Sequence, residues 1–185
     1  MKIVIVNGSY RIKWKHIFVL LVIFLCMMAF MRYTALQVKV VSRGTGVLDL
    51  NVGNSVEHVQ QTLMELGYDG RMYYLKHFLV VDGIYAMVYA IFYFFSIRFL
   101  LHKNEIRRKR VYLFSVFPIV GMLFDWLENL SLSFLLVNGT TEPATWCMLF
   151  RVSNILKFLF VYLSLLIVVL GNLGLLFTKR LCLRG

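Results

Sequence analysis

The sequence has few charged residues. Only 16% of its 185 residues are Asp, Glu, Lys or Arg, while 60% are hydrophobic. Soluble domains are roughly 45–50% apolar and roughly 25% charged. The shortage of charge therefore excludes an ordinary soluble domain and indicates an integral membrane protein.

Sequence signatures of common enzyme chemistries are missing as well. The three cysteines form no C-x-x-C, which argues against a quinone-linked thiol oxidoreductase. There is no G-x-S-x-G, no H-E-x-x-H and no P-loop, so serine hydrolase, zinc protease and nucleotide chemistry have no local support. The four histidines are scattered along the chain. We therefore predict no metal site and no cofactor.

Long apolar runs dominate what is present. Crossing a hydrocarbon core of about 30 Å takes about 20 helical residues. Four runs reach or approach that length: residues 14–31, 77–101, 111–137 and 152–177. The remaining chain is too short for a second domain, so residues 1–185 are predicted to form one all-α integral membrane domain, a four-transmembrane-helix bundle.

The basic residues predict the orientation of the bundle. They cluster before the first run, between the second and third runs, and after the fourth. If the spans alternate in direction, these segments lie on one side, which the positive-inside rule assigns to the cytoplasm. We expect a multi-pass protein of a plasma or inner membrane with both termini cytoplasmic. Because topology accounts for the net charge of +11, no nucleic-acid partner is predicted.

Strand-like patterns occur in two short segments. Asn7-Gly8 separates two such stretches within residues 1–15, which predicts a hairpin before the first span. In the extracytoplasmic segment 32–76, "LQVKVV" and "GVLDLNV" flank the turn residues "SRGTG". Ser55 then suits the N-cap of a helix that ends near Gly67. We expect a small ββα cap between the first two spans.

Polar side chains interrupt the third run. Asp125, Glu128 and Asn129 have the spacing i, i+3 and i+4, which places them on one face of a helix. From the rise of about 1.5 Å per residue, they lie between the outer boundary and the midplane of the membrane. Ionisable groups at such depths cost about 2.5–3.5 kcal/mol or more unless they are paired or hydrated. This face must therefore point toward protein.

The second and fourth runs carry polar groups at matching depths. Asp82 precedes Tyr85 and Tyr89 on one face of the second run, and Asn154 precedes Lys157 on the fourth. We predict that these groups and the acids of the third run converge in one cavity open to the outer side. Three carboxylates would face one ammonium, so we expect at least one carboxyl to be protonated or a cation to be bound.

These residues suggest roles in binding or catalysis. General acid–base catalysis by a carboxyl group is the one catalytic mode they support. The candidate catalytic residues are Asp125, Glu128 and Asp82. The candidate ligand-binding residues are Lys157, Asn129, Asn154, Tyr85, Tyr89 and Arg71. We expect Lys157 to meet an acidic or polar head group, and Trp126 and Met122 to line the apolar body of the site.

The predicted function is binding, with or without processing, of a lipid-like or amphipathic ligand in this cavity. Two alternatives remain open. Polar side chains also hold membrane helices together, so the chain can be an accessory subunit whose cap docks a membrane protein partner. It can also form a homo-oligomeric ion or proton pathway. Four ionisable groups on three spans exceed what helix association needs, which favours the cavity. Membrane lipids are the expected surroundings in each case.

Overall fold

The computed structural model describes residues 13–104, 109–139 and 144–182. The helices in chain order are α1 (Trp14–Val41), α2 (Val56–Tyr73), the π-helical turn η1 (Tyr74–Phe78), α3 (Leu79–Lys103), the 3-10 helix η2 (Lys109–Val116), α4 (Phe117–Asn138) and α5 (Ala144–Cys182). The turn of the predicted N-terminal hairpin, and all but its last three residues, lie outside the described residues.

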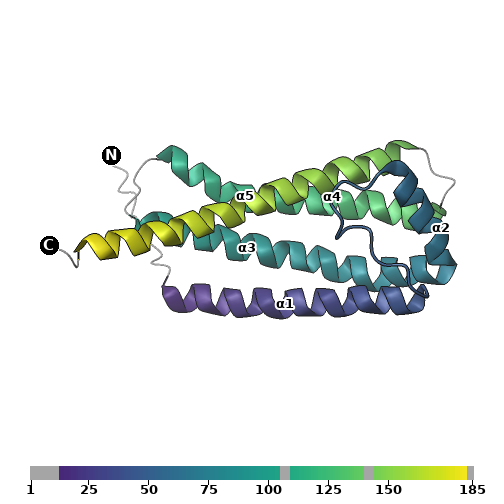
Figure 1. The fold of residues 1–185 in the computed structure, drawn as a ribbon, viewed down its shortest axis with the longest axis horizontal. Helices are drawn as coiled ribbons and strands as arrows, with labels where there is room; N and C mark the ends of the chain where they lie inside the picture. The colour runs from purple at the N-terminus through teal and green to yellow at the C-terminus, as the bar shows by residue number, and fades with distance from the viewer. Residues whose placement is uncertain (1–12, 105–108, 140–143, 183–185) are drawn as a thin grey trace, which may run out of the picture.

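Four long helices run side by side, and α2 lies across one end of them (Figure 1). We call this the loop end, and the opposite end, where α1 begins and α5 finishes, the basic end. Among the described residues, four helical segments are long and apolar enough to cross a membrane: Trp14–Val41, Val56–Lys103, Tyr112–Asn138 and Ala144–Gly174. The described part of this multi-pass membrane protein is thus all-helical with four candidate spans, as its apolar runs predicted.

The strands of the predicted cap are not formed. Residues 13–104 contain no strand, and the segment Leu36–Val41 is the last part of α1. Met31, Thr34 and Val38 are buried along one side of α1, so its helical periodicity continues past the predicted membrane boundary. Their spacing of three and four residues suits a helix and not a strand. Packing on this face therefore overrides the β-propensity of the valines.

The helix predicted after the hairpin is confirmed at its start. The Ser55 side chain caps α2 by accepting a hydrogen bond from the His58 backbone N–H at 3.2 Å. Gly67, where the sequence predicted the helix to end, has a φ of 60° that only glycine adopts readily. The chain bends there but then continues through η1 into α3, so α2 and the second span form one interrupted helical segment.

The helix pairs differ in how closely they pack and in the side chains that they use. Gly121 brings α4 close to α5, because a Cβ atom at this position would lie 3.3 Å from the Phe160 Cβ atom. Helix α1 packs on α3 through aromatic rings, with Phe24 stacked on Phe92 at a centroid distance of 5.1 Å. Within the described chain, no Cα atom of α1 lies within 8 Å of a Cα atom of α5, although both helices lie against α3.

Candidate functional site: a buried polar pocket

Two hydrogen bonds join the polar faces of α3 and α4. The Asn129 amide donates to the Asp82 carboxylate at 2.8 Å, and the Tyr89 hydroxyl donates to Asp125 at 3.1 Å. Asp82, Tyr85 and Tyr89 share one face of α3 because their spacing is i, i+3 and i+7. The helical register therefore points both sets of side chains into the interface between α3 and α4.

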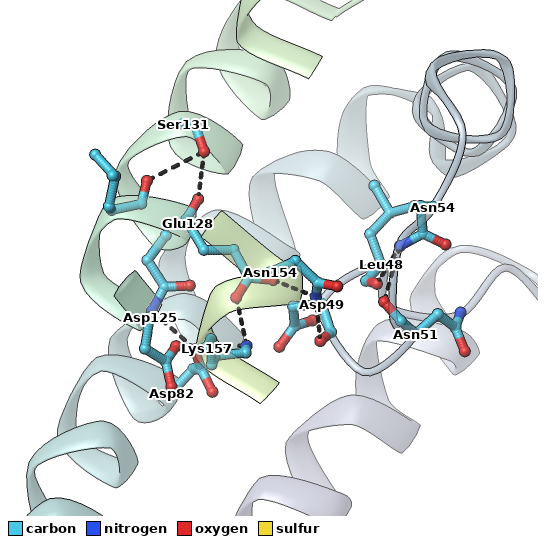
Figure 2. A network of polar contacts seen from close by, with 12 residues as sticks. Leu48, Asp49, Asn51, Asn54, Asp82, Asp125, Glu128, Ser131, Asn154 and Lys157 are labelled. Carbon is cyan, nitrogen blue, oxygen red and sulfur yellow. Dashed lines mark hydrogen bonds and ion pairs between the residues drawn. The ribbon is translucent and has the colours of Figure 1, made fainter. Parts of the chain in front are cut away.

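Lysine and asparagine side chains of α5 complete the link between the helices. Lys157 Nζ lies 2.5 Å from Glu128 Oε2 and 3.5 Å from Asp125 Oδ1. One turn earlier on α5, the Asn154 amide donates to Glu128 Oε1 at 2.9 Å. Both carboxylates of α4 are thus held by α5, as Figure 2 shows.

The loop between α1 and α2, residues 42–55, enters the same cluster. The Asn154 amide also donates to the Asp49 backbone carbonyl at 3.2 Å, and its oxygen accepts from the Gly53 N–H at 2.9 Å. Asn54 closes the loop on itself by donating to the Leu48 carbonyl at 2.8 Å. Leu48 and Asp49 are consecutive and both fully buried, so this loop is inserted between the helices at the loop end.

Tyr74, in the π-helical turn, anchors the loop. Its hydroxyl accepts a hydrogen bond from the Leu48 N–H at 2.9 Å and donates to Asp49 Oδ1 at 2.5 Å. Single π-helical turns widen a helix locally and are frequent at functional sites. Here the turn places the Tyr74 hydroxyl beside the backbone of the loop, which fixes the Asp49 side chain among the polar residues of the three helices.

The charges of this polar pocket do not balance. It holds four carboxyl groups, from Asp49, Asp82, Asp125 and Glu128, and one ammonium, from Lys157. The exposed fraction of each of these residues is 6% or less. Within the described residues, the formal charge of the pocket with every group ionised is −3. Buried groups of like charge disfavour each other's ionisation.

Asp49 lies outside the four spans, and the charge imbalance of the pocket affects the pKa of its carboxyl. The pKa of its carboxyl is raised to about 8, mainly by burial. The negative charge of Asp82 contributes to this shift, while the ammonium of Lys157 opposes it. The carboxyl of Asp49 therefore changes charge near neutral pH, unlike an exposed aspartate.

A cavity of about 160 Å³ adjoins the polar pocket. Its polar wall is formed by Asp49, Asp82, Asp125 and Lys157. The remainder is apolar or aromatic and comes from α1 (Phe24, Met31), α3 (Tyr85, Tyr89, Tyr93), α5 (Phe158, Val161) and the loop (Leu50). The cavity therefore has one charged side and one hydrophobic side.

One carboxylate oxygen at this cavity has no partner. Asp49 Oδ1 accepts from Tyr74, but Asp49 Oδ2 has no hydrogen-bond partner among the described residues, although it is fully buried. Leaving a buried acceptor unpaired costs about 1–3 kcal/mol, and more for a charged group. Helix association alone does not account for this oxygen.

Most of the predicted site residues come together. Asp82, Asp125, Glu128, Asn129, Asn154, Tyr89 and Lys157 belong to the contacts described above, and Tyr85 lines the cavity. Arg71 does not join them, because its guanidinium donates to the Gly67 carbonyl at 3.2 Å and lies beside Gly139. Trp126 is 41% exposed and its indole donates to the Gly83 carbonyl, so its prediction as a cavity residue is wrong. Met122 packs against the aromatic cluster of α1 and α3 without lining the cavity.

Two residues of the site were missed from sequence. Asp49 and Tyr74 lie in the segment predicted as a cap, where strand alternation would have directed Asp49 to solvent. The available signal was a single acid inside the apolar stretch "GVLDLNV".

Among the described residues, no group of three or more His, Cys, Asp or Glu is arranged to hold a metal ion. No protein-family model, curated protein or solved structure matches this chain.

Proposed function

We propose that the polar pocket and its cavity bind an amphipathic, lipid-like ligand within the membrane. The observation that carries this proposal is the cavity of about 160 Å³ beside the unpartnered carboxylate oxygen of Asp49. Ligand sites in proteins combine a mostly apolar wall with a few convergent polar groups. The charged and hydrophobic sides of this cavity match the two parts of an amphipathic molecule.

Access from the membrane also supports a lipid-like ligand. The loop 42–55 covers the pocket toward the loop end, with Leu48 and Asn54 buried. The apolar wall of the cavity lies between α1 and α5, which have no Cα atoms within 8 Å of each other in the described chain. A ligand dissolved in the bilayer can reach the cavity between these two helices without crossing the loop.

The structure favours the carboxylates over Lys157 as the groups that meet the head group. The ammonium of Lys157 already pairs with both Glu128 and Asp125. An acidic head would have to compete with these two buried carboxylates. Any processing of the ligand would use proton transfer by Asp82 or Asp125, because both line the cavity. Glu128 does not line it, so we assign Glu128 to holding Lys157.

The alternative of an ion or proton pathway has less support. The Asp, Glu, Lys, Arg and His side chains that are buried in the described residues all belong to the polar pocket. Toward the basic end, the buried residues of α3 are aromatic or aliphatic apart from Ser96. A pathway would need polar groups or water along the rest of its length, and the described residues of one chain do not supply them.

Filling the cavity tests the proposal. Val161 lines the cavity and Leu159, two residues away on α5, is 48% exposed. Val161→Trp should abolish amphipathic ligands that co-purify with the wild-type protein in nanodiscs, as measured by native mass spectrometry, while Leu159→Trp retains them. Melting temperature confirms that both variants fold. If the two variants retain the same ligands, or if the wild type retains none from any added class of amphiphile, the accessory-subunit alternative is favoured.

A further inference from the structure

The charges of the polar pocket discriminate between head groups. Four carboxyl groups face one ammonium, and that ammonium is already shared between Glu128 and Asp125. Asp49 and Asp82 line the cavity without a cationic partner within 4.0 Å in the described residues. An added cation would relieve the repulsion among the acids, whereas an added anion would increase it.

An unpartnered carboxylate oxygen of the pocket also indicates a hydrogen-bond donor. Asp49 Oδ2 is a buried acceptor, and an ammonium group supplies a charge-assisted hydrogen bond to such an oxygen. The aromatic rings of Tyr85, Tyr89 and Phe158 line the cavity nearby. Aromatic faces attract cations, including quaternary ammonium groups. Both features favour a positively charged head group over a neutral or negative one.

A second cavity continues along the same helices toward the basic end. It has a volume of about 300 Å³ and lies between α1 and α5 on the surface of α3, where Leu21, Ser96 and Val168 mark its three walls. The first cavity reaches Tyr93 on α3, only one turn from Ser96. The two cavities therefore follow one another along the gap between α1 and α5.

The length of this gap suits a hydrocarbon chain. Asp82 and Ser96 are separated by about 21 Å along α3 at 1.5 Å per residue. Half of a bilayer core, the depth that one lipid chain covers, is about 15 Å. Apart from Ser96 and Asn172, the residues that line the second cavity are apolar or aromatic, among them Leu21, Phe99 and Val168. A chain attached to a head group at Asp49 can therefore extend through this second cavity.

We propose that the ligand is a single-chain amphiphile with a cationic amine head group, bound with the amine beside Asp49 and Asp82 and the chain between α1 and α5. This assignment rests on the proposed function and narrows it to one ligand class. The amine forms the missing hydrogen bond to Asp49 Oδ2 and reduces the negative charge of the pocket. The hydrocarbon chain lies against α3 in the gap between α1 and α5.

Three probes with the same chain and different head groups test the charge assignment. Hexadecyltrimethylammonium, hexadecanol and palmitate are each added to the protein in nanodiscs, and bound molecules are counted by native mass spectrometry. We expect the ammonium probe to bind about tenfold or more tightly than the other two, which corresponds to about 1.4 kcal/mol, because its positive charge is attracted by the acids and by the aromatic faces of the cavity. A primary amine, hexadecylamine, should bind at least as tightly because it donates hydrogen bonds.

Single-site variants locate the head group. Asp49→Asn and Asp82→Asn should each weaken the binding of hexadecylamine about tenfold, because each removes a carboxylate that the protonated amine contacts. Glu65→Gln is the matched control, because Glu65 is an exposed acid on α2 outside the pocket, and it should leave binding unchanged. Unchanged binding in both Asp49→Asn and Asp82→Asn would overturn the assignment of the head group.

A second pair of variants locates the chain. Val168 lines the second cavity, and its neighbour Val169 is 46% exposed on the other side of α5. Val168→Trp should weaken hexadecyltrimethylammonium about tenfold but leave octyltrimethylammonium, whose chain is too short to reach it, unaffected. Val169→Trp should change neither probe. Equal effects of the two variants would overturn the placement of the chain.

The head-group series separates this inference from the proposed function. If hexadecanol or palmitate binds best, and Val161→Trp removes that binding, the cavity is a lipid site but the amine assignment is wrong. If no probe binds and no ligand co-purifies, both proposals fail.

Discussion

The two sides of α3 pack against the other helices in different ways. On one side, α4 and α5 form an interface in which Gly121 permits close approach and the Lys157–Glu128 ion pair and Asn154 join charged and polar groups. On the other side, α1 contributes no charged side chain to the pocket and contacts α3 through rings such as Phe24 and Trp14. Buried charges thus fix one side of the bundle, while the other side retains cavities.

This difference assigns stability mainly to the α4–α5 interface and ligand access mainly to the α1–α3 interface. Polar groups inside a membrane are costly unless they are paired, so the α4–α5 interface tolerates little change once it has formed. Each ring contact between α1 and α3 contributes about 0.5–1.5 kcal/mol beyond the area it buries, and its loss leaves no charge unpaired. We therefore expect substitutions in the first interface to act mainly on folding, and substitutions along the second to act mainly on the ligand.

The largest effect is expected from Lys157→Met. Removing the ammonium leaves Glu128 and Asp125 buried without their ion pair, and breaking one partner of a buried pair typically costs about 3–5 kcal/mol. The unfolding free energy in detergent should fall by that amount. Lys39→Met, at an exposed lysine of α1, should change it by less than about 0.5 kcal/mol. Equal losses in the two variants would show that the ion pair contributes nothing specific.

A smaller effect is expected from crowding the α4–α5 contact. In Gly121→Val the new side chain meets Phe160 and Val161, and overpacking of this kind costs about 1–3 kcal/mol. Gly83→Ala, on α3 where a Cβ atom meets nothing within 4 Å, should be neutral or stabilising. Chemical unfolding of both variants measures the difference. A tolerant Gly121→Val would mean that α4 and α5 are not closely packed.

The pH dependence of the unfolding free energy should reveal the titration of Asp49, the buried carboxyl of the loop 42–55. The pKa of Asp49 is about 8 in the folded protein, against an ordinary value of 3.8, so the folded state holds the proton more tightly than the unfolded state. This contribution to stability is complete below about pH 4 and is lost as the pH rises toward 8. The groups that face Asp49 are Asp82, Glu128, Lys157 and Tyr74.

Asp49→Asn isolates this contribution, because an amide does not titrate. Melting temperatures between pH 4 and 8 should decline more steeply in the wild type than in the variant. Parallel curves for the two proteins would contradict the burial of the Asp49 carboxyl.

The smallest effect is expected on the outer face of α1. Phe18 is 66% exposed and faces away from the bundle, so Phe18→Ala should change the unfolding free energy by no more than about 0.5 kcal/mol. Unfolding in detergent at two protein concentrations provides the measurement. A large, concentration-dependent loss would show that a second copy of the chain covers this face and would remove α1 from the ligand-access side.

Helical register and depth sufficed to predict the centre of the site. Asp82, the acids of α4 and Lys157 were expected to meet because each lies on a polar face at a similar depth, and the observed contacts join them. Asp49 could not be found in this way, because its position depends on a non-helical loop that enters the bundle. Loop positions follow from tertiary contacts, here those of Asn154 and Tyr74, which no local pattern specifies.

The predicted hairpin failed for a related reason. Valines after Leu36 have β-propensity, but Val38 and Thr34 are buried on the side of α1 that faces the bundle, and the end of α1 packs closely on α2, where a Cβ atom at Gly70 would lie 3.1 Å from that of Ser42. Packing against a distant segment decided the structure of this stretch. The position of Arg71 likewise depends on how α2 lies across the loop end.

A double-mutant cycle between Asp49 and Lys157 tests most directly whether the loop and the helices share one electrostatic site. Unfolding free energies are measured for Asp49→Asn, Lys157→Met and the double variant. We expect the double variant to lose less unfolding free energy than the two single variants lose in total, by about 0.5–3 kcal/mol. The reason is that removing the Asp49 carboxyl reduces the negative charge that the loss of Lys157 leaves unbalanced. Additivity within about 0.3–0.5 kcal/mol would instead show that Asp49 and Lys157 act independently and that the shared pocket does not exist.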